Sequence, residues 1–187
     1  MKDSLRTIWR WVKWPIYILA AGYVLLVIYD IQRLFDIDKT NGAVAAIHAQ
    51  KITLADVQGT NLPPVPDQAE NDATVAGVDK NNNGVRDDVE LAIFKKYPNS
   101  AKIRAAELQY AMTEQMYLTR VFNTETWKAV AEEVGRAHLC VLDVDANRKE
   151  VEALVFNTKL RNDARERVYE FITSYGPADG ESCDVSL

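Results

Sequence analysis

The feature that constrains this sequence most is an uncharged run near its N-terminus. No charged residue occurs between Trp14 and Tyr29, where most positions hold aliphatic or aromatic residues. As a helix, this run covers about 24 Å at about 1.5 Å per residue, slightly less than the ~30 Å hydrocarbon core of a bilayer. Val12 and Ile31 extend its apolar length, and the charged residues beside it can snorkel to the interface. The run therefore predicts one transmembrane helix over residues 14–31.

The residues that flank the run indicate its orientation. Residues 1–13 carry four basic residues and one acidic residue, and three tryptophans stand at this border. Such residues gather at a membrane interface, and the basic ones favour the cytoplasmic side. A cleaved signal peptide needs a small-residue site soon after the run, whereas the triplet at 43–45 lies well downstream. We therefore expect an uncleaved signal anchor in a bacterial-type inner or cell membrane, with residues 1–13 in the cytoplasm.

The segment that follows, residues 32–71, is expected to be an extracytoplasmic stalk. Asn41-Gly42 is expected to break it, and residues 43–49 form a short helical candidate. Three prolines within residues 62–67 stiffen its second half, because each fixes φ and restricts the residue before it. The sequence leaves open whether this arm lies on the next domain or holds that domain away from the bilayer.

A second constrained stretch runs from Asp79 to Glu90. Oxygen-bearing side chains occupy its first, third, fifth, ninth and twelfth positions, and Gly84 occupies the sixth. A hard dication such as calcium takes roughly six to eight oxygen ligands, and a loop that turns sharply at a glycine can supply them. The expected ligands are five side chains and one backbone carbonyl, that of the valine: Asp79, Asn81, Asn83, Val85, Asp87 and Glu90.

This spacing resembles the calcium loops of EF-hand and dockerin domains and the repeats of thrombospondin type 3 modules. The resemblance covers residues 79–90 only, and it implies bound Ca²⁺. It departs from the EF-hand pattern at the eighth position, where an apolar residue usually meets a partner loop and this chain has Arg86. No second loop of this spacing occurs in the sequence, and two side-chain ligands are neutral asparagines. We therefore expect one weak, structural calcium site; a helix-capping turn without an ion is the alternative.

The rest of the sequence is expected to be helical. Capping residues and apolar stripes predict four helices, which begin near residues 87, 100, 124 and 147 and extend to about 97, 122, 141 and 175. The tetrapeptide Val-Phe-Asn-Thr occurs at 121–124 and again at 155–158, which we take as coincidence. The predicted fold is all-α, with one transmembrane helix and a small extracytoplasmic helical bundle over residues 72–187 that carries the calcium loop.

The two cysteines of the chain, Cys140 and Cys183, are expected to pair. The predicted topology places both in an oxidising compartment, where disulfides persist. Loop-closure entropy gives such a bridge about 4 kcal/mol of stabilisation. Two free thiols are the alternative, and they would accompany the reverse orientation.

Two glutamates on the second predicted bundle helix form the remaining candidate site. Glu107 and Glu114 are seven residues apart, so they lie on one side of a helix among apolar residues. Buried carboxylates need partners, and Asn157 and Arg161 on the last helix are the expected ones. No nucleophile or Glu-x-x-His motif accompanies the acids, so the four residues predict a structural polar network without catalytic residues.

Charge and motifs limit the function classes. A net charge of −5 argues against nucleic acid as a partner, because phosphate binding needs a basic face. The leading expectation is a membrane-anchored, non-enzymatic binding or scaffolding module with structural calcium and a protein or envelope partner. The alternatives are a calcium-stabilised, anchored hydrolase of envelope polymers and a cytosol-facing accessory subunit of a membrane complex.

Overall fold

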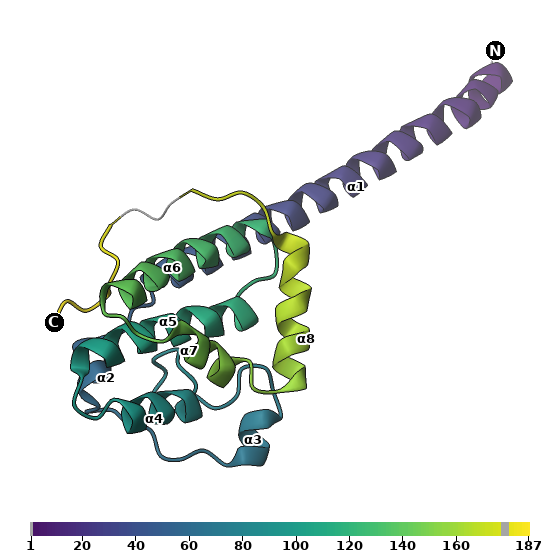
Figure 1. Ribbon diagram of the computed structural model, residues 1–187. Coiled ribbons are helices and arrows are strands. Elements are labelled where there is room, and N and C mark those ends of the chain that lie inside the picture. The colour runs from purple at the N-terminus through teal and green to yellow at the C-terminus, as the bar shows by residue number, and fades with distance from the viewer. Residues whose placement is uncertain (1, 177–179) are drawn as a thin grey trace. The chain divides into compact units, whose positions relative to one another are not determined.

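The computed structural model describes residues 2–176 and 180–187, with side chains from residue 13 onward. All regular structure in these ranges is helical (Figure 1), which confirms the all-α class. The chain divides into two compact units, residues up to 42 and residues 43–187. The elements are α1 (Lys2–Ala49), α2 (Leu54–Gln58), α3 (Gln68–Asp72), α4 (Asp87–Lys96), α5 (Ala101–Thr119), α6 (Thr124–Asp143), α7 (Arg148–Val155), α8 (Lys159–Val168) and the 3₁₀ turn η1 (Tyr169–Phe171).

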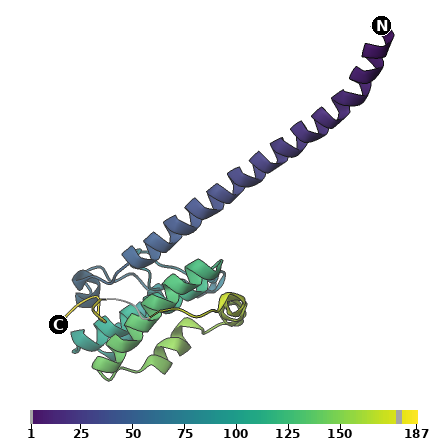
Figure 2. The ribbon, with the colours of Figure 1, turned by 90° about the horizontal axis from the view of Figure 1, so that it is seen from above.

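The first unit is the N-terminal part of α1, which Figure 2 shows as one uninterrupted helix. Within residues 13–49, this helix is long and apolar enough to cross a membrane, and its apolar stretch is not buried. The prediction of one apolar N-terminal helix long enough to cross a membrane is confirmed. The expected break at Asn41-Gly42 is wrong, because the helix continues to Ala49. One glycine within a helix costs only about 1 kcal/mol, and the alanine-rich residues 43–49 favour continuation.

The second unit is built around α5. Fourteen of the 19 residues of this helix are buried, and α2, α4, α6, α7 and α8 all contact it. In Figure 1, α6 runs along one side of α5, and α4 and α7 lie on another. A helix surrounded in this way has no polar face to expose, so its glutamates, glutamines and arginine are enclosed with its apolar residues. This arrangement agrees with the expectation of a central helix packed on more than one side.

Residues 43–71, predicted as a stalk, belong to this second unit. Ile47, Ile52 and Val57 are 0–2 % exposed and contribute to the core. The Arg104 side chain on α5 donates a hydrogen bond to the Val57 carbonyl at 3.0 Å. The arm is therefore packed into the helical unit, and the boundary lies at residue 43, not at residue 72.

The predicted last helix is broken into α7 and α8 at residues 156–158. Thr158 caps α8 by accepting a hydrogen bond from the Arg161 N–H at 3.2 Å. The Asn162 amide donates to the carbonyls of Phe156 and Thr158 at 2.7 and 2.8 Å, which satisfies groups that a continuous helix would pair. Asn123 caps α6 in the same manner. A helix start thus lies near each copy of Val-Phe-Asn-Thr, although the capping residue is the third of the four in the first copy and the fourth in the second.

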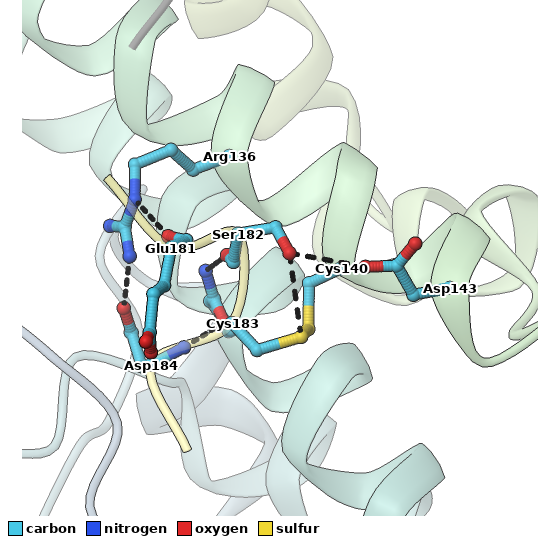
Figure 3. Close-up of a disulfide and its surroundings, with 8 residues drawn as sticks. Arg136, Cys140, Asp143, Glu181, Ser182, Cys183 and Asp184 are labelled. Atoms are coloured by element: carbon cyan, nitrogen blue, oxygen red, sulfur yellow. Dashed lines mark hydrogen bonds and ion pairs between the residues drawn. A yellow bond between two sulfur atoms is a disulfide. The ribbon is translucent and has the colours of Figure 1, made fainter. Parts of the chain in front are cut away.

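The predicted pairing of Cys140 with Cys183 is confirmed, with an S–S distance of 2.03 Å. Figure 3 shows the C-terminal tail fastened beside α6 on both sides of this bridge. The Arg136 side chain donates to the Glu181 carbonyl at 2.9 Å and pairs with Asp184 at 3.1 Å. Covalent and ionic contacts therefore hold residues 181–184 against the bundle.

Candidate functional site

The stretch from Asp79 to Glu90 is a tight loop that runs into α4. The Asp79 Oδ2 atom accepts the Gly84 N–H at 2.9 Å, and Asn83 Oδ1 accepts the Val85 N–H at 2.8 Å. Gly84 has a φ of +87°, a left-handed conformation that favours glycine. These bonds fold the first half of the loop back on itself, as the spacing of its oxygen-bearing residues predicts.

Three hydrogen bonds then join the first half of the loop, and the residue before it, to α4. The Asp87 N–H donates to the Val78 carbonyl at 2.8 Å, and Asp87 Oδ1 accepts the Lys80 N–H at 3.0 Å. The Asn81 amide donates to Glu90 Oε2, also at 3.0 Å. Asp87 and Glu90, in the first turn of α4, are thereby held against the residues that precede the helix.

The three carboxylates of the loop share an unusual pattern of hydrogen bonding. In each, one oxygen accepts a hydrogen bond from the loop and the other is buried without a hydrogen-bond partner: Asp79 Oδ1, Asp87 Oδ2 and Glu90 Oε1. Asp87 and Glu90 are both 0 % exposed. A buried carboxylate oxygen without a hydrogen-bond partner lowers the stability of the fold. Three such oxygens within twelve residues therefore indicate that the loop lacks a compensating positive charge.

The electrostatics of the loop point the same way. Burial raises the pKa of Asp79 and of Asp87 above the usual aspartate range. Burial also raises the pKa of Glu90 to about 7, and the nearby charges of Asp56 and Asp87 act in the same direction. The Asn81 and Asn83 amides oppose this shift without cancelling it. A cation among these groups would remove the penalty that burial places on their ionised forms.

The fit of the six expected ligands to a metal is partial. Asp79, Asp87 and Glu90 each offer a free oxygen, whereas Asn81 turns its amide nitrogen toward Glu90. Rotation of that amide would present its oxygen. In the described part of the chain, no three His, Cys, Asp or Glu side chains are gathered closely enough to hold a metal ion. The loop thus has the right donor atoms, but coordination requires its carboxylates to converge further.

Arg86, the residue that departs from the EF-hand pattern, has a clear structural place. Its side chain is 1 % exposed and donates to the Leu154 and Val155 carbonyls, at 2.7 and 3.1 Å, where α7 ends. It also pairs with Asp88, at 2.5 Å. A cation is favourable at a helix C-terminus because it satisfies the last carbonyls and complements the helix dipole. Arg86 therefore fastens the loop to α7, where an EF-hand would use a partner loop.

The predicted polar network of four residues is only partly assembled. Asn157 and Arg161 contact each other at 2.6 Å. Arg161, which is fully buried, directs its remaining donors to Asp72 and to the backbone carbonyls of residues 71, 74 and 75. Arg161 thus joins α8 to the segment before the loop of residues 79–90, which we call the calcium-type loop. This contact links residues about 90 positions apart in the sequence, and the helical pattern did not predict it.

The two glutamates of that network have other neighbours. Glu107 accepts a hydrogen bond from the Asn147 N–H at 3.3 Å. Glu114 lies near Tyr110 and lines a pocket. The expectation that Asn157 and Arg161 partner these acids is therefore wrong. The two glutamates and the Asn157–Arg161 pair lie in separate polar surroundings. Comparisons of the chain with protein-family models, with curated proteins and with solved structures found no match.

Proposed function

We propose that residues 79–90 bind one calcium ion and that this ion stabilises a membrane-anchored helical module. The observation that carries the proposal is the set of buried oxygens without hydrogen-bond partners on Asp79, Asp87 and Glu90. A divalent cation supplies a partner to all three at once, and carboxylate and amide oxygens are the ligands that calcium prefers. The neutral asparagines place the site at the weak end of the calcium-binding range.

The proposed role of the ion is structural because the loop joins several parts of the second unit. The loop begins just after residues 71–75, which Arg161 binds, and it ends within α4. Arg86 binds the loop to the end of α7. Calcium that binds the folded state only stabilises it by mass action, by about 2.7 kcal/mol when its concentration is 100 times Kd. The ion would thus add to the stability of the surrounding helices.

The same proposal includes membrane anchorage, with the N-terminus in the cytoplasm and the second unit outside. It is supported by the exposed apolar length of α1, by the basic residues before Trp14 and by the Cys140–Cys183 pair, which suits an oxidising compartment. We propose a non-enzymatic module of a bacterial-type inner or cell membrane that binds or scaffolds a protein or envelope partner.

Calcium titration by isothermal calorimetry tests the metal site. The full chain in maltoside micelles should bind one Ca²⁺, and Glu90→Gln should weaken binding at least tenfold, because the substitution removes a ligand charge but preserves side-chain size. Glu166→Gln, at an exposed position of α8, makes the same change in net charge and should bind as the wild type does. If the wild type took up no Ca²⁺ at millimolar concentration, or if both variants bound equally, the loop would not be the site.

Thiol labelling tests the topology. In intact spheroplasts, an impermeant reductant followed by an impermeant maleimide should label Cys183, which is partly exposed, whereas the maleimide without reductant should label neither cysteine. Labelling that required permeabilised membranes would place the second unit in the cytoplasm and refute the proposed orientation.

A further inference from the structure

A pocket of about 240 Å³ opens beside α5, α6 and α8, separate from the 79–90 loop. Four electron-rich aromatic side chains line it, one from each of four segments: Tyr117, Trp127, Tyr169 and Tyr175. Glu114 and Arg165 provide its charged groups. The volume is below the roughly 300–1,000 Å³ of pockets for drug-sized ligands, so the pocket suits a small group.

Two of the lining rings contact each other edge to face. Trp127 and Tyr175 meet nearly at right angles, with an angle of 82° and ring centroids 5.6 Å apart. Trp127 is 6 % exposed and forms the inner wall, whereas Tyr169 and Tyr175 are half exposed at the mouth. The indole N–H of Trp127 is buried without a well-aligned hydrogen bond, although the Tyr117 hydroxyl lies close. Ring faces carry partial negative charge, so such walls attract a cation.

Glu114 adds a carboxyl group to the same pocket. It is 8 % exposed, and none of the ion pairs among the described residues includes it. The Tyr110 hydroxyl lies beside Glu114, but it donates its single proton to Glu152 at 2.9 Å. Burial raises the pKa of Glu114 to about 7. A buried carboxylate of this kind lacks the cation that usually accompanies it.

Arg165 does not fill that role. Its guanidinium stacks on the Phe156 ring at 4.4 Å, and it acts on Glu114 through charge at a distance, without a salt bridge. The pocket therefore combines aromatic walls, an unpaired carboxylate and a small volume. An uncharged aromatic or sugar ligand would leave that carboxylate without a partner.

We propose that this pocket binds a substituted ammonium group, such as the trimethylammonium group of choline. The cation lies among the aromatic rings and pairs with Glu114, and a ligand hydroxyl can accept a hydrogen bond from the Trp127 N–H. This inference is independent of the proposed calcium site, because the two sites share no residue. A soluble ammonium compound and a phosphatidylcholine headgroup present the same chemistry, so the experiment includes both.

The test compares choline with its uncharged carbon analogue, 3,3-dimethylbutan-1-ol. The full chain is labelled with 5-fluorotryptophan and held in maltoside micelles, which contain no ammonium group, at constant ionic strength and pH 8. The ¹⁹F signal of Trp127, assigned with Trp127→Phe, should shift with choline, and the analogue should bind at least tenfold more weakly. Displacement of choline by dihexanoylphosphatidylcholine at lower concentration would assign the site to a headgroup, and failure to displace it would assign the site to the soluble compound.

Two variants separate the charge from the aromatic walls. Glu114→Gln should weaken choline binding at least tenfold, with Glu166→Gln as the matched control that leaves it unchanged. Tyr175→Leu, at an exposed position, should weaken it at least threefold even if the Glu114 variant does not fold. Equal binding of choline and the analogue, an unshifted Trp127 signal, or wild-type affinity in both folded variants would overturn the proposal.

Discussion

Arg86→Met removes the contact that fastens the calcium-type loop to the rest of the second unit. The guanidinium bonds to the Leu154 and Val155 carbonyls and to Asp88, and the side chain is 1 % exposed. Methionine preserves the buried apolar stem but leaves both carbonyls without a donor. We expect the variant to be destabilised because the contact with the Val155 carbonyl is buried and the contact with the Leu154 carbonyl is partly buried.

The magnitude follows from the contacts that are lost. Each buried polar group left without a partner costs about 1–3 kcal/mol, and Asp88 also loses its ion pair, although its 27 % exposed side chain can be solvated in part. The free energy of unfolding should fall by about 3–5 kcal/mol, which is a large share of the roughly 5–15 kcal/mol that stabilises a typical domain. Arg86→Lys should recover little of it, because an ammonium group cannot reproduce the planar fork of donors.

Urea unfolding of the full chain in maltoside micelles with saturating Ca²⁺, followed by circular dichroism at 222 nm, measures this difference. Arg120→Met is the matched control, since Arg120 is exposed and its side chain donates a single hydrogen bond within the described residues, to Gln50 at 3.0 Å. The control should lose less than about 1 kcal/mol. If Arg86→Met unfolded at the same urea concentration as Arg120→Met, the loop would not depend on this contact.

Three further predictions concern the disulfide, a glycine and pH. Serine at both cysteines should lower the free energy of urea unfolding by about 4 kcal/mol, because the bridge closes a loop of 43 residues. Gly77→Ala should cost about 1–3 kcal/mol in the same assay, because φ is +68° and a Cβ atom would overlap the Arg86 side chain, whereas Gly135→Ala, in open space within α6, should be neutral or stabilising. In saturating Ca²⁺, stability should fall by about 3 kcal/mol as pH rises from 4.5 to 7, because folded Glu114 keeps its proton to a pKa of about 7 while the unfolded state releases it near 4.5. Urea unfolding across this range should show a flatter profile for Glu114→Gln.

Local features of the sequence predict a good part of this fold. Ser100 caps α5 and Asn123 caps α6, as the short polar residues before each apolar stripe suggest. The uncharged run predicts the apolar part of α1, and the two cysteines of the chain pair as expected. These features succeed because each depends on neighbouring residues or on a single possible pairing.

The differences arise where contacts distant in sequence decide the outcome. Residues 43–71 read as a stalk because of their prolines, but Ile47, Ile52 and Val57 find a core that only the folded helices provide. The break at residues 156–158 coincides with the burial of Arg161, whose partners include Asp72. The repeated Val-Phe-Asn-Thr was the available local signal for this break.

In the candidate site, too, the sequence predicts the local turn but not the contacts with residues distant in the chain. The spacing of oxygen-bearing residues predicts a loop that turns at Gly84, and the hydrogen bonds of Asp79 and Asn83 form that turn. The spacing does not reveal that Arg86 reaches α7, since Val155 lies 69 residues away. A charged residue at a position that is usually apolar was the only sign that this loop packs differently.

The most direct test of calcium binding is thermal unfolding of the full chain in maltoside micelles with 5 mM Ca²⁺ and with EDTA. With a Kd of about 0.1 mM, within the weak part of the calcium range, 5 mM Ca²⁺ stabilises by about 2.3 kcal/mol, which corresponds to a rise in Tm of about 5–9 °C for a unit of this size. Glu90→Gln, with Ca²⁺ bound at least tenfold more weakly, should reduce the difference between the two conditions by at least about half. Identical Tm values for the wild type in Ca²⁺ and in EDTA would contradict a calcium ion in the 79–90 loop.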